Sequence, residues 1–213
     1  MESDKTNIAL TTVTIFIAFT ILSVSFLRIA TPTYTYNSTS YAYSPMVLSE
    51  KVETEVMPEK VDYQLAYQGK IGPDNPLWYA KAVRDRARYI LAFNPTKKAE
   101  LNLLYADKRL NSSIELFKNN KPDLGLITLT KAEKYLESAE LQMTDDSELY
   151  KKIGLSSLKH REVIENEILP ITPEDLRPQV IKTLNYSKEV YTKVKEHMFL
   201  KGLVPPANPF DSN

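Results

Sequence analysis

Apolar residues recur every three or four positions from residue 76 to residue 201, the spacing that lines one face of an α-helix. Proline, asparagine and acidic residues interrupt this pattern where helices typically end and begin. No period-two run of valine, isoleucine and aromatic residues occurs in this range, and short turns favour antiparallel neighbours. The sequence therefore predicts an all-α fold, an antiparallel bundle of about five helices. The expected helices are residues 76–93, 95–118, 123–143, 147–169 and 173–201.

Residues that commonly cap helices lie at several of these boundaries. Asn94 is expected to be the N-cap of the second helix, with Pro95 at its first position. The run from Thr172 to Asp175, which reads TPED, resembles a capping box, with a hydroxyl at the N-cap and a carboxylate three residues later. Gly202 is a typical residue to follow the last turn of a helix.

The first predicted helix is amphipathic, but the sequence leaves open whether it packs on the bundle or swings free of it. At its first turn, Trp78 and Tyr79 have two interpretations: they staple the helix start onto the core, or they form an edge that contacts a partner. The first interpretation is favoured, because an aromatic pair beside a proline usually has this role. The apolar face of this helix consists of Leu77, Ala80, Val83, Ala87 and Ile90.

An apolar segment near the N-terminus has the length of a membrane-spanning helix. From Ile8 to Leu27, twenty consecutive residues carry no charge. As a helix this run is about 30 Å long, the thickness of the hydrocarbon core of a bilayer. Its serine and threonine hydroxyls can bond back to carbonyls of the same helix, so they do not preclude insertion.

Two interpretations of this segment compete, a cleaved secretory signal and an uncleaved anchor. A signal has a basic start, a shorter apolar centre and a small-residue cleavage site. Here Glu2 and Asp4 precede the run, and the sequence after Arg28 is a poor cleavage site. We therefore expect a cytoplasmic head over residues 1–7 and a transmembrane signal-anchor helix over residues 8–29. A long C-terminal domain translocates largely regardless of charge, so it is expected outside the cell.

The segment after the anchor has a different composition. Tyrosines alternate with serine and threonine at Tyr34, Tyr36, Tyr41 and Tyr43. With no second strand of this type to pair with, they are interpreted as an extended tether whose aromatic rings lie near the headgroups. The alternative is a contact site for a wall polymer or a partner. The expected organisation is a tether over residues 30–70, a helical domain over 71–202 and a Pro-rich tail over 203–213.

The composition excludes several classes of function but does not identify one. Among 213 residues, 27 are basic and 27 acidic, so no basic excess points to nucleic acid. The absence of cysteine excludes disulfides, thiol catalysis and thiolate metal sites. Five glycines and two histidines leave little for phosphate loops or acid–base chemistry. We expect no catalytic residue and no cofactor.

His160 is the one candidate for a metal or acid–base site. It falls on the inner face of the fourth predicted helix, seven residues after Ile153. A buried packing histidine that donates one hydrogen bond is the favoured interpretation, and a metal or ligand site the alternative. His197 is expected to lie roughly 20 Å away along the helical hairpin, so the two histidines cannot share one ion.

The first two predicted helices carry many basic residues. A solvated face with ion pairs is favoured, since Asp85, Glu100 and Asp107 interleave with them. The alternative is attraction to anionic lipid headgroups or wall polymers. The basic residues are Lys81, Arg84, Arg86, Arg88, Lys97, Lys98, Lys108 and Arg109.

Several motifs cluster between residues 71 and 120. They are Pro73, PLWY at 76–79, Lys81, LAFNPTKKAEL at 91–101 and ADKRL at 106–110. This stretch resembles the bacterial domain of unknown function DUF5667, and a looser similarity continues through SLKH at 157–160. The resemblance implies exported or membrane-anchored helical proteins of bacteria, and it supplies no catalytic residue.

The favoured function is a non-catalytic, single-pass membrane protein that displays a helical bundle for protein or cell-envelope contacts. Its expected partners are the membrane, through residues 8–29, and an envelope protein or wall polymer. The alternative is an extracytoplasmic ligand- or cation-sensing domain with a site near His160. An enzyme is disfavoured.

Overall fold

The computed structural model describes residues 60–142 and 146–211. All described residues belong to one compact unit, Glu53–Asn213. The expected membrane helix over residues 8–29 lies outside the described residues. Within the described ranges, no helix has the length and apolar character needed to cross a membrane.

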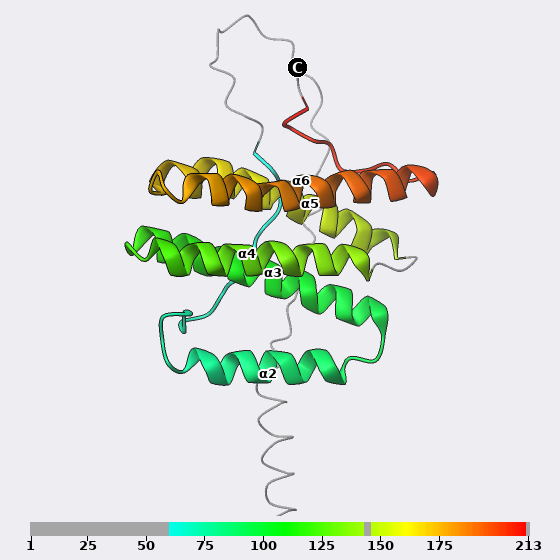
Figure 1. Ribbon diagram of the computed structural model, residues 1–213. Coiled ribbons are helices and arrows are strands. Elements are labelled where there is room, and N and C mark those ends of the chain that lie inside the picture. The colour runs from blue at the N-terminus through cyan, green and yellow to red at the C-terminus, as the bar shows by residue number, and fades with distance from the viewer. Residues whose placement is uncertain (1–59, 143–145, 212–213) are drawn as a thin grey trace, which may run out of the picture. The chain divides into compact units, whose positions relative to one another are not determined.

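The described residues form five α-helices and no strand, as the helical periodicity predicts (Figure 1). A π-helical turn, η1, and a 3₁₀ turn, η2, extend the fourth of them. When η1 and η2 are counted with α5, the expected bounds agree with the observed ones to within four residues. The elements are α2 (Trp78–Leu91), α3 (Pro95–Lys118), α4 (Pro122–Leu141), α5 (Ser147–Val163), η1 (Ile164–Ile168), η2 (Leu169–Ile171) and α6 (Arg177–Leu200).

The helices lie in layers (Figure 1). Helices α3 and α4 form one hairpin, α5 and α6 form a second, and α4 packs on α6 while α3 contacts α5. Two apolar clusters fill the space between the hairpins. One includes Leu110, Leu129 and Ile164, and the other includes Leu136 and Ile153, all with no exposed surface. Helix α2 forms a further layer outside α3 and α4 (Figure 1).

Two of the expected helix caps are present. The side chain of Asn94 accepts a hydrogen bond of 2.9 Å from the backbone N–H of Thr96, at the start of α3. Gly202 follows α6 with φ of +68°, a backbone conformation that favours glycine. Local sequence signals therefore determine these two boundaries.

The expected capping box at the start of the last helix is wrong. Helix α6 begins at Arg177, after a turn in which the carbonyl of Pro173 accepts from the N–H groups of Leu176 and Arg177. The hydroxyl of Thr172 instead donates to the carbonyl of Ile168, at 2.7 Å. Because the end of the preceding helical segment uses this hydroxyl, Thr172 does not cap α6.

The chain on either side of the helices also packs on the bundle. Residues 60–70, here called the strap, run extended across it; they are the described end of the expected tether (Figure 1). Val61 packs with Leu158 and Tyr191 in a small apolar cluster. In the tail after α6, the carbonyl of Pro206 accepts a hydrogen bond from Tyr191.

Candidate functional site

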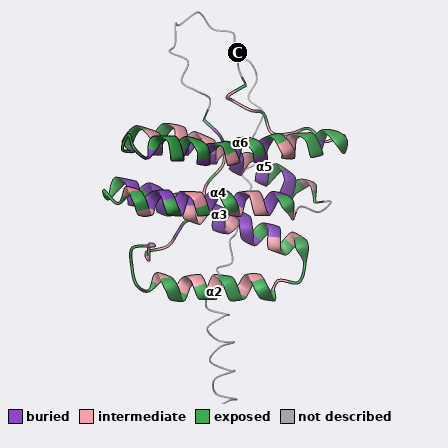
Figure 2. Ribbon diagram, in the orientation of Figure 1, coloured by how far each residue is buried: buried purple, intermediate pink, exposed green. Residues whose placement is uncertain are grey.

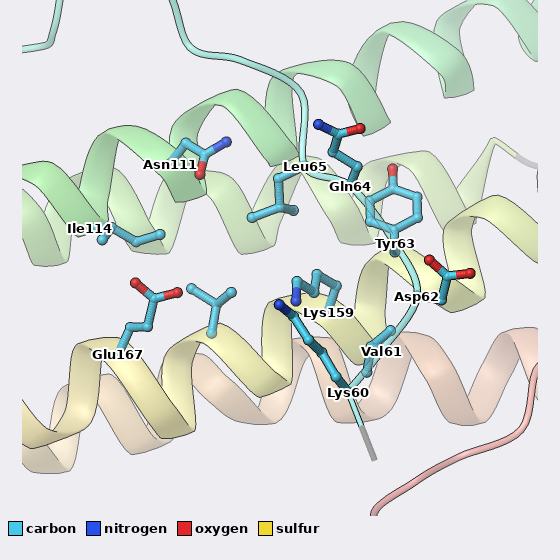
Figure 3. Close-up of a pocket in the computed structure, with 11 residues that line it drawn as sticks. Lys60, Val61, Asp62, Tyr63, Gln64, Leu65, Asn111, Ile114, Lys159 and Glu167 are labelled. Carbon is cyan, nitrogen blue, oxygen red and sulfur yellow. The ribbon is translucent and has the colours of Figure 1, made fainter. Parts of the chain in front are cut away.

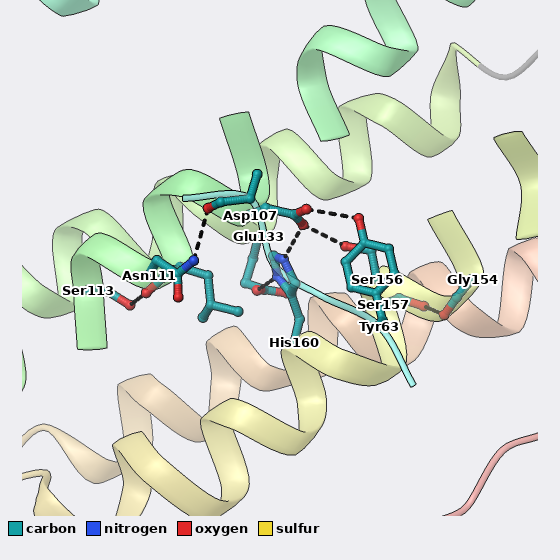
Figure 4. Close-up of polar contacts among 11 residues, drawn as sticks. Tyr63, Asp107, Asn111, Ser113, Glu133, Gly154, Ser156, Ser157 and His160 are labelled. Atoms are coloured by element: carbon teal, nitrogen blue, oxygen red, sulfur yellow. Dashed lines mark hydrogen bonds and ion pairs between the residues drawn. The ribbon is translucent and has the colours of Figure 1, made fainter. Parts of the chain in front are cut away.

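Three helices each place one ionisable side chain at the centre of the bundle. His160 of α5 is fully buried, and its Nδ1 lies 2.6 Å from Oε1 of Glu133 in α4. Its Nε2 lies 3.3 Å from Oδ1 of Asp107 in α3. Glu133 and Asp107 are buried as well. Both ring nitrogens of one histidine therefore face carboxylates that come from two other helices (Figure 4).

These carboxylates keep His160 protonated. Burial in the core lowers the pKa of the imidazole, but the charge of Glu133 and the hydrogen bonds with Asp107 and Glu133 together outweigh that effect and raise it to about 9. An imidazolium donates from both nitrogens, which matches two carboxylate acceptors. At neutral pH the site is a buried cation between two acidic side chains.

Asp107 also joins this site to the strap. Its Oδ1 accepts a hydrogen bond of 2.8 Å from the hydroxyl of Ser156, and its Oδ2 accepts one of 2.8 Å from the hydroxyl of Tyr63. Tyr63 belongs to the strap, which thus reaches the buried cluster directly (Figure 4). We call Tyr63, Asp107, Glu133, Ser156 and His160 the polar cluster.

Two further hydrogen bonds hold the strap along its length. The N–H of Val61 donates to Oε2 of Glu162 at 2.8 Å, and Nδ2 of Asn111 donates to the carbonyl of Ala66 at 2.9 Å. At its far end, the ammonium of Lys81 in α2 donates to the carbonyl of Gln68. The strap is therefore fastened to α3, α5 and α2.

Replacing Tyr63 by phenylalanine is expected to lower the free energy of unfolding by about 1.5 kcal/mol, because it removes a hydrogen bond to a charged acceptor. Equilibrium unfolding in urea measures this loss. The matched control is Tyr67→Phe, four residues along the strap, whose side chain is 67% exposed. Its effect is expected within about 0.5 kcal/mol of zero. Equal losses in the two variants would contradict the role of the Tyr63–Asp107 bond.

The chemistry open to the polar cluster is limited by its geometry. Its acidic and imidazole groups pair with one another, and in the described part of the chain no group of three or more His, Asp or Glu side chains is arranged to hold a metal ion. One atom is an exception to this pairing. Oε2 of Glu133 is buried with no hydrogen-bond partner. The cluster thus has one unused acceptor.

A hollow of about 560 Å³ lies along the strap (Figure 3). Lys159 and Glu167 give it charged walls, and Leu65, Ile114 and Val163 give it apolar ones. His160 is not among the residues that line it. Tyr63 is therefore common to the hollow and the polar cluster, whereas Asp107, Glu133 and His160 do not line the hollow.

Helix α2 rests on the bundle through its polar face. The hydroxyl of Tyr105 in α3 donates to the carbonyl of Asp85 at 3.1 Å, and Nε2 of Gln142 donates to the hydroxyl of Tyr89 at 2.7 Å. The guanidinium of Arg109 lies over the ring of Trp78, 5.4 Å from its centroid. Hydrogen bonds and cation–π contacts, rather than apolar packing, join α2 to α3 and α4.

The apolar face of α2 points to solvent. Not one residue of this helix is buried (Figure 2). Val83 is 70% exposed and Ile90 60% exposed, although the 3–4 spacing is the one that usually marks a buried stripe. The structure thus answers the question that the sequence left open: α2 packs on the bundle, with its apolar side outward. We call Leu77, Tyr79, Val83, Ile90 and Leu91 the α2 face; each is more than half exposed.

The other residues singled out in the sequence have separate positions. Trp78 is half-buried and faces Arg109, whereas Tyr79 is 76% exposed. His160 lies in the core, as its position on the helix predicts. His197 is exposed on α6, with its ring edge-on to Tyr150. The structure therefore places Trp78 against the bundle and Tyr79 in solvent, and it places one histidine in the core and the other at the surface.

Sequence reasoning missed the two partners of His160. The sequence pattern favours a solvated, charged face for Asp107, and no expectation concerns Glu133. A signal was present nevertheless. Asp107 lies four residues after Leu103, and Glu133 lies four residues after Leu129, so each acidic residue falls on the buried stripe of its helix. Acidic residues on two inner stripes and a histidine on a third predict a buried ionic cluster.

Comparison with known proteins supports the resemblance found in the sequence. No curated protein matches the chain, and no solved structure matches it. A family model does match. The matched residues begin at the end of the strap and include α2, α3, α4, α5 and the turns that follow α5. Asp107, Glu133 and His160 therefore lie within the match. Residues 70–174 match the model of a family described as a domain of unknown function, DUF5667.

Proposed function

We propose that this protein is a non-catalytic, single-pass membrane protein that displays its helical domain outside the cell for contacts with a protein or an envelope component. The observation that carries the proposal is the exposed α2 face. Soluble proteins rarely expose a contiguous apolar surface of this kind unless something binds there. The uncharged run from Ile8 to Leu27 supports the membrane anchor.

The membrane topology is tested with single-cysteine variants of the full chain, since the native chain has no cysteine. Ser3→Cys marks the expected head, and Ile127→Cys marks an exposed position of α4. A membrane-impermeant maleimide is expected to label residue 127 in intact cells and residue 3 only after permeabilisation. The reverse pattern would contradict the proposed orientation, and release of the chain by alkaline extraction would contradict the anchor.

The contact surface is tested by photo-crosslinking of the same full chain in its membrane. A photoreactive residue at position 83 is compared with one at position 181, because Ile181 is an exposed apolar residue of α6 outside the α2 face. Adducts at position 83 are expected to exceed those at position 181 severalfold, and mass spectrometry separates lipid from protein adducts. Equal yields would contradict a contact through the α2 face.

A second candidate function is the sensing of a cation or small ligand near His160. The buried, unpartnered Oε2 of Glu133 favours it, because such an acceptor is unusual in a core. Titration of the full chain with Mg²⁺, Ca²⁺ or Zn²⁺ tests this function, since a ligand that binds only the native state raises the unfolding temperature. A rise that Glu133→Gln abolishes would support sensing, and no rise with any of the ions would contradict cation sensing.

A further inference from the structure

The α2 face has the residue pattern of a helix that lies along a membrane surface. At 3.6 residues per turn, the exposed Arg86 borders the apolar surface on one flank of Val83, while Arg84 on the other flank pairs with Asp85. Tyr79 adds an amphipathic ring at one end of the face, where it is 76% exposed. Aromatic and basic residues beside an apolar face are typical of interfacial helices.

Charge along α2 is strongly one-sided. The helix contains four basic residues and one acidic residue, Asp85. The acidic residue lies away from the apolar surface, where its carboxylate pairs with Arg84 at 2.6 Å and its carbonyl accepts from Tyr105. The exposed side of α2 therefore presents apolar residues and Arg86 without a carboxylate of its own helix among them. This composition suits a partner with anionic groups above an apolar layer.

The inward side of α2 explains why the apolar side stays exposed. Lys81 and Trp78 point toward the strap and α3, where the ammonium bonds to the carbonyl of Gln68 and the indole stacks with Arg109. Turning the apolar face inward would break these contacts and leave the polar groups of α3 and α4 without partners. The polar contacts thus fix the rotation of the helix, and the α2 face is held outward.

From this geometry we infer that α2 lies in the headgroup region of the anionic bilayer that carries the chain, with the α2 face buried at the boundary of the acyl chains. The inference rests on the proposed function, in which the α2 face is the contact surface. It identifies the bilayer as the partner of that face. The stem of the exposed Arg86 lies along the apolar layer, and its guanidinium group reaches lipid phosphates.

Two further observations favour the bilayer over a second copy of the chain. A dimer through the α2 face would place Arg86 of both copies at one interface, and like charges oppose such pairing. In contrast, residues 28–59 span at most about 110 Å even when fully extended, which keeps the domain near the bilayer that holds the expected anchor. Such tethering raises the effective concentration, so a modest intrinsic affinity is sufficient.

The experiment places nitroxide labels on single cysteines of the full chain in nanodiscs of phosphatidylcholine and phosphatidylglycerol. Ile90→Cys probes the α2 face, and Ile127→Cys is the matched control, an isoleucine of α4 with 51% exposure. Ala18→Cys marks the expected anchor. The measurement is the ratio of nitroxide collisions with oxygen, which enriches in lipid, to those with a nickel chelate, which stays in water.

The inference predicts a ratio severalfold higher at residue 90 than at residue 127, together with a high ratio at residue 18. A high ratio at residue 18 with equal, low ratios at residues 90 and 127 would overturn the inference and leave the anchor standing. A low ratio at residue 18 would overturn the proposed anchor itself. Dipolar broadening of the label at residue 90 would show a second copy on the α2 face and would also overturn the inference.

A charge variant tests the same contact independently. Val83→Glu, combined with the label at residue 90, is expected to return the collision ratio to the level of residue 127. Ile181→Glu is the control on α6 and is expected to leave the ratio at residue 90 unchanged. Because α2 has no buried residue, Val83→Glu leaves the core intact, and circular dichroism verifies this. An unchanged ratio in Val83→Glu would contradict insertion of the α2 face.

Discussion

Replacing His160 by glutamine is expected to lower the free energy of unfolding by about 3–5 kcal/mol. The substitution removes the cation that lies between Glu133 and Asp107, and it leaves two buried carboxylates without a counter-charge. Glutamine has nearly the same volume as histidine, so the loss arises from electrostatics more than from a cavity. Equilibrium unfolding in urea at pH 7 measures the change.

His197→Gln is the matched control, because the chain has two histidines and this one is exposed. Its expected effect is about 1 kcal/mol or less, the size of its single aromatic contact with Tyr150. The double variant His160→Gln, Glu133→Gln is expected to lose less than the sum of the two single variants, since the two side chains form one buried pair. Additive losses, or equal losses at residues 160 and 197, would contradict the ionic cluster.

Stability is also expected to depend on pH through the same histidine. The pKa of His160 is 6.5 in the unfolded chain and about 9 in the folded one, so between these values the folded state binds a proton that the unfolded state does not. The stabilisation is fully present below pH 6.5 and is lost as the pH rises through 9. From pH 6 to pH 8 the free energy of unfolding is expected to fall by about 2 kcal/mol.

A second group, Lys81, titrates near the upper end of this pH range. Burial lowers the pKa of Lys81 to about 8, with nearby basic residues adding to the effect, so this lysine contributes an opposite slope at higher pH. Comparison of the native chain with His160→Gln separates the contribution of His160 to the pH dependence of stability from that of Lys81. The difference in unfolding free energy between the native chain and His160→Gln is expected to shrink between pH 6 and pH 8. A difference that stays constant over this range would show that folding does not raise the pKa of His160.

The polar cluster gives the bundle a specific arrangement of helices. Apolar stripes tolerate small shifts of one helix along another, but Asp107, Glu133 and His160 pair only when α3, α4 and α5 lie in one register. Tyr63 extends this requirement to the strap. The same contacts therefore connect the end of the expected tether to the core of the domain.

Much of the secondary structure follows from local signals in the sequence. The predicted helix over residues 95–118 coincides with α3, because Asn94 and Pro95 specify its start and the apolar spacing continues without interruption. Gly202 is expected after the last turn of the final helix, and it follows α6 with a positive φ. The start of α6 was missed, since Thr172 has two possible hydrogen-bond partners and only the path of η2 decides between them.

The sequence by itself determined an all-α domain, the approximate bounds of its helices, the inward position of His160 and the resemblance to DUF5667. These features depend on residues close together in the chain, where spacing and capping act directly. Only the tertiary structure decided that Asp107 and Glu133 enclose His160 and that the apolar side of α2 faces outward. Both depend on the rotation of one helix relative to another. That rotation is set by contacts between residues far apart in sequence, such as Tyr105 with Asp85, which no local pattern reveals.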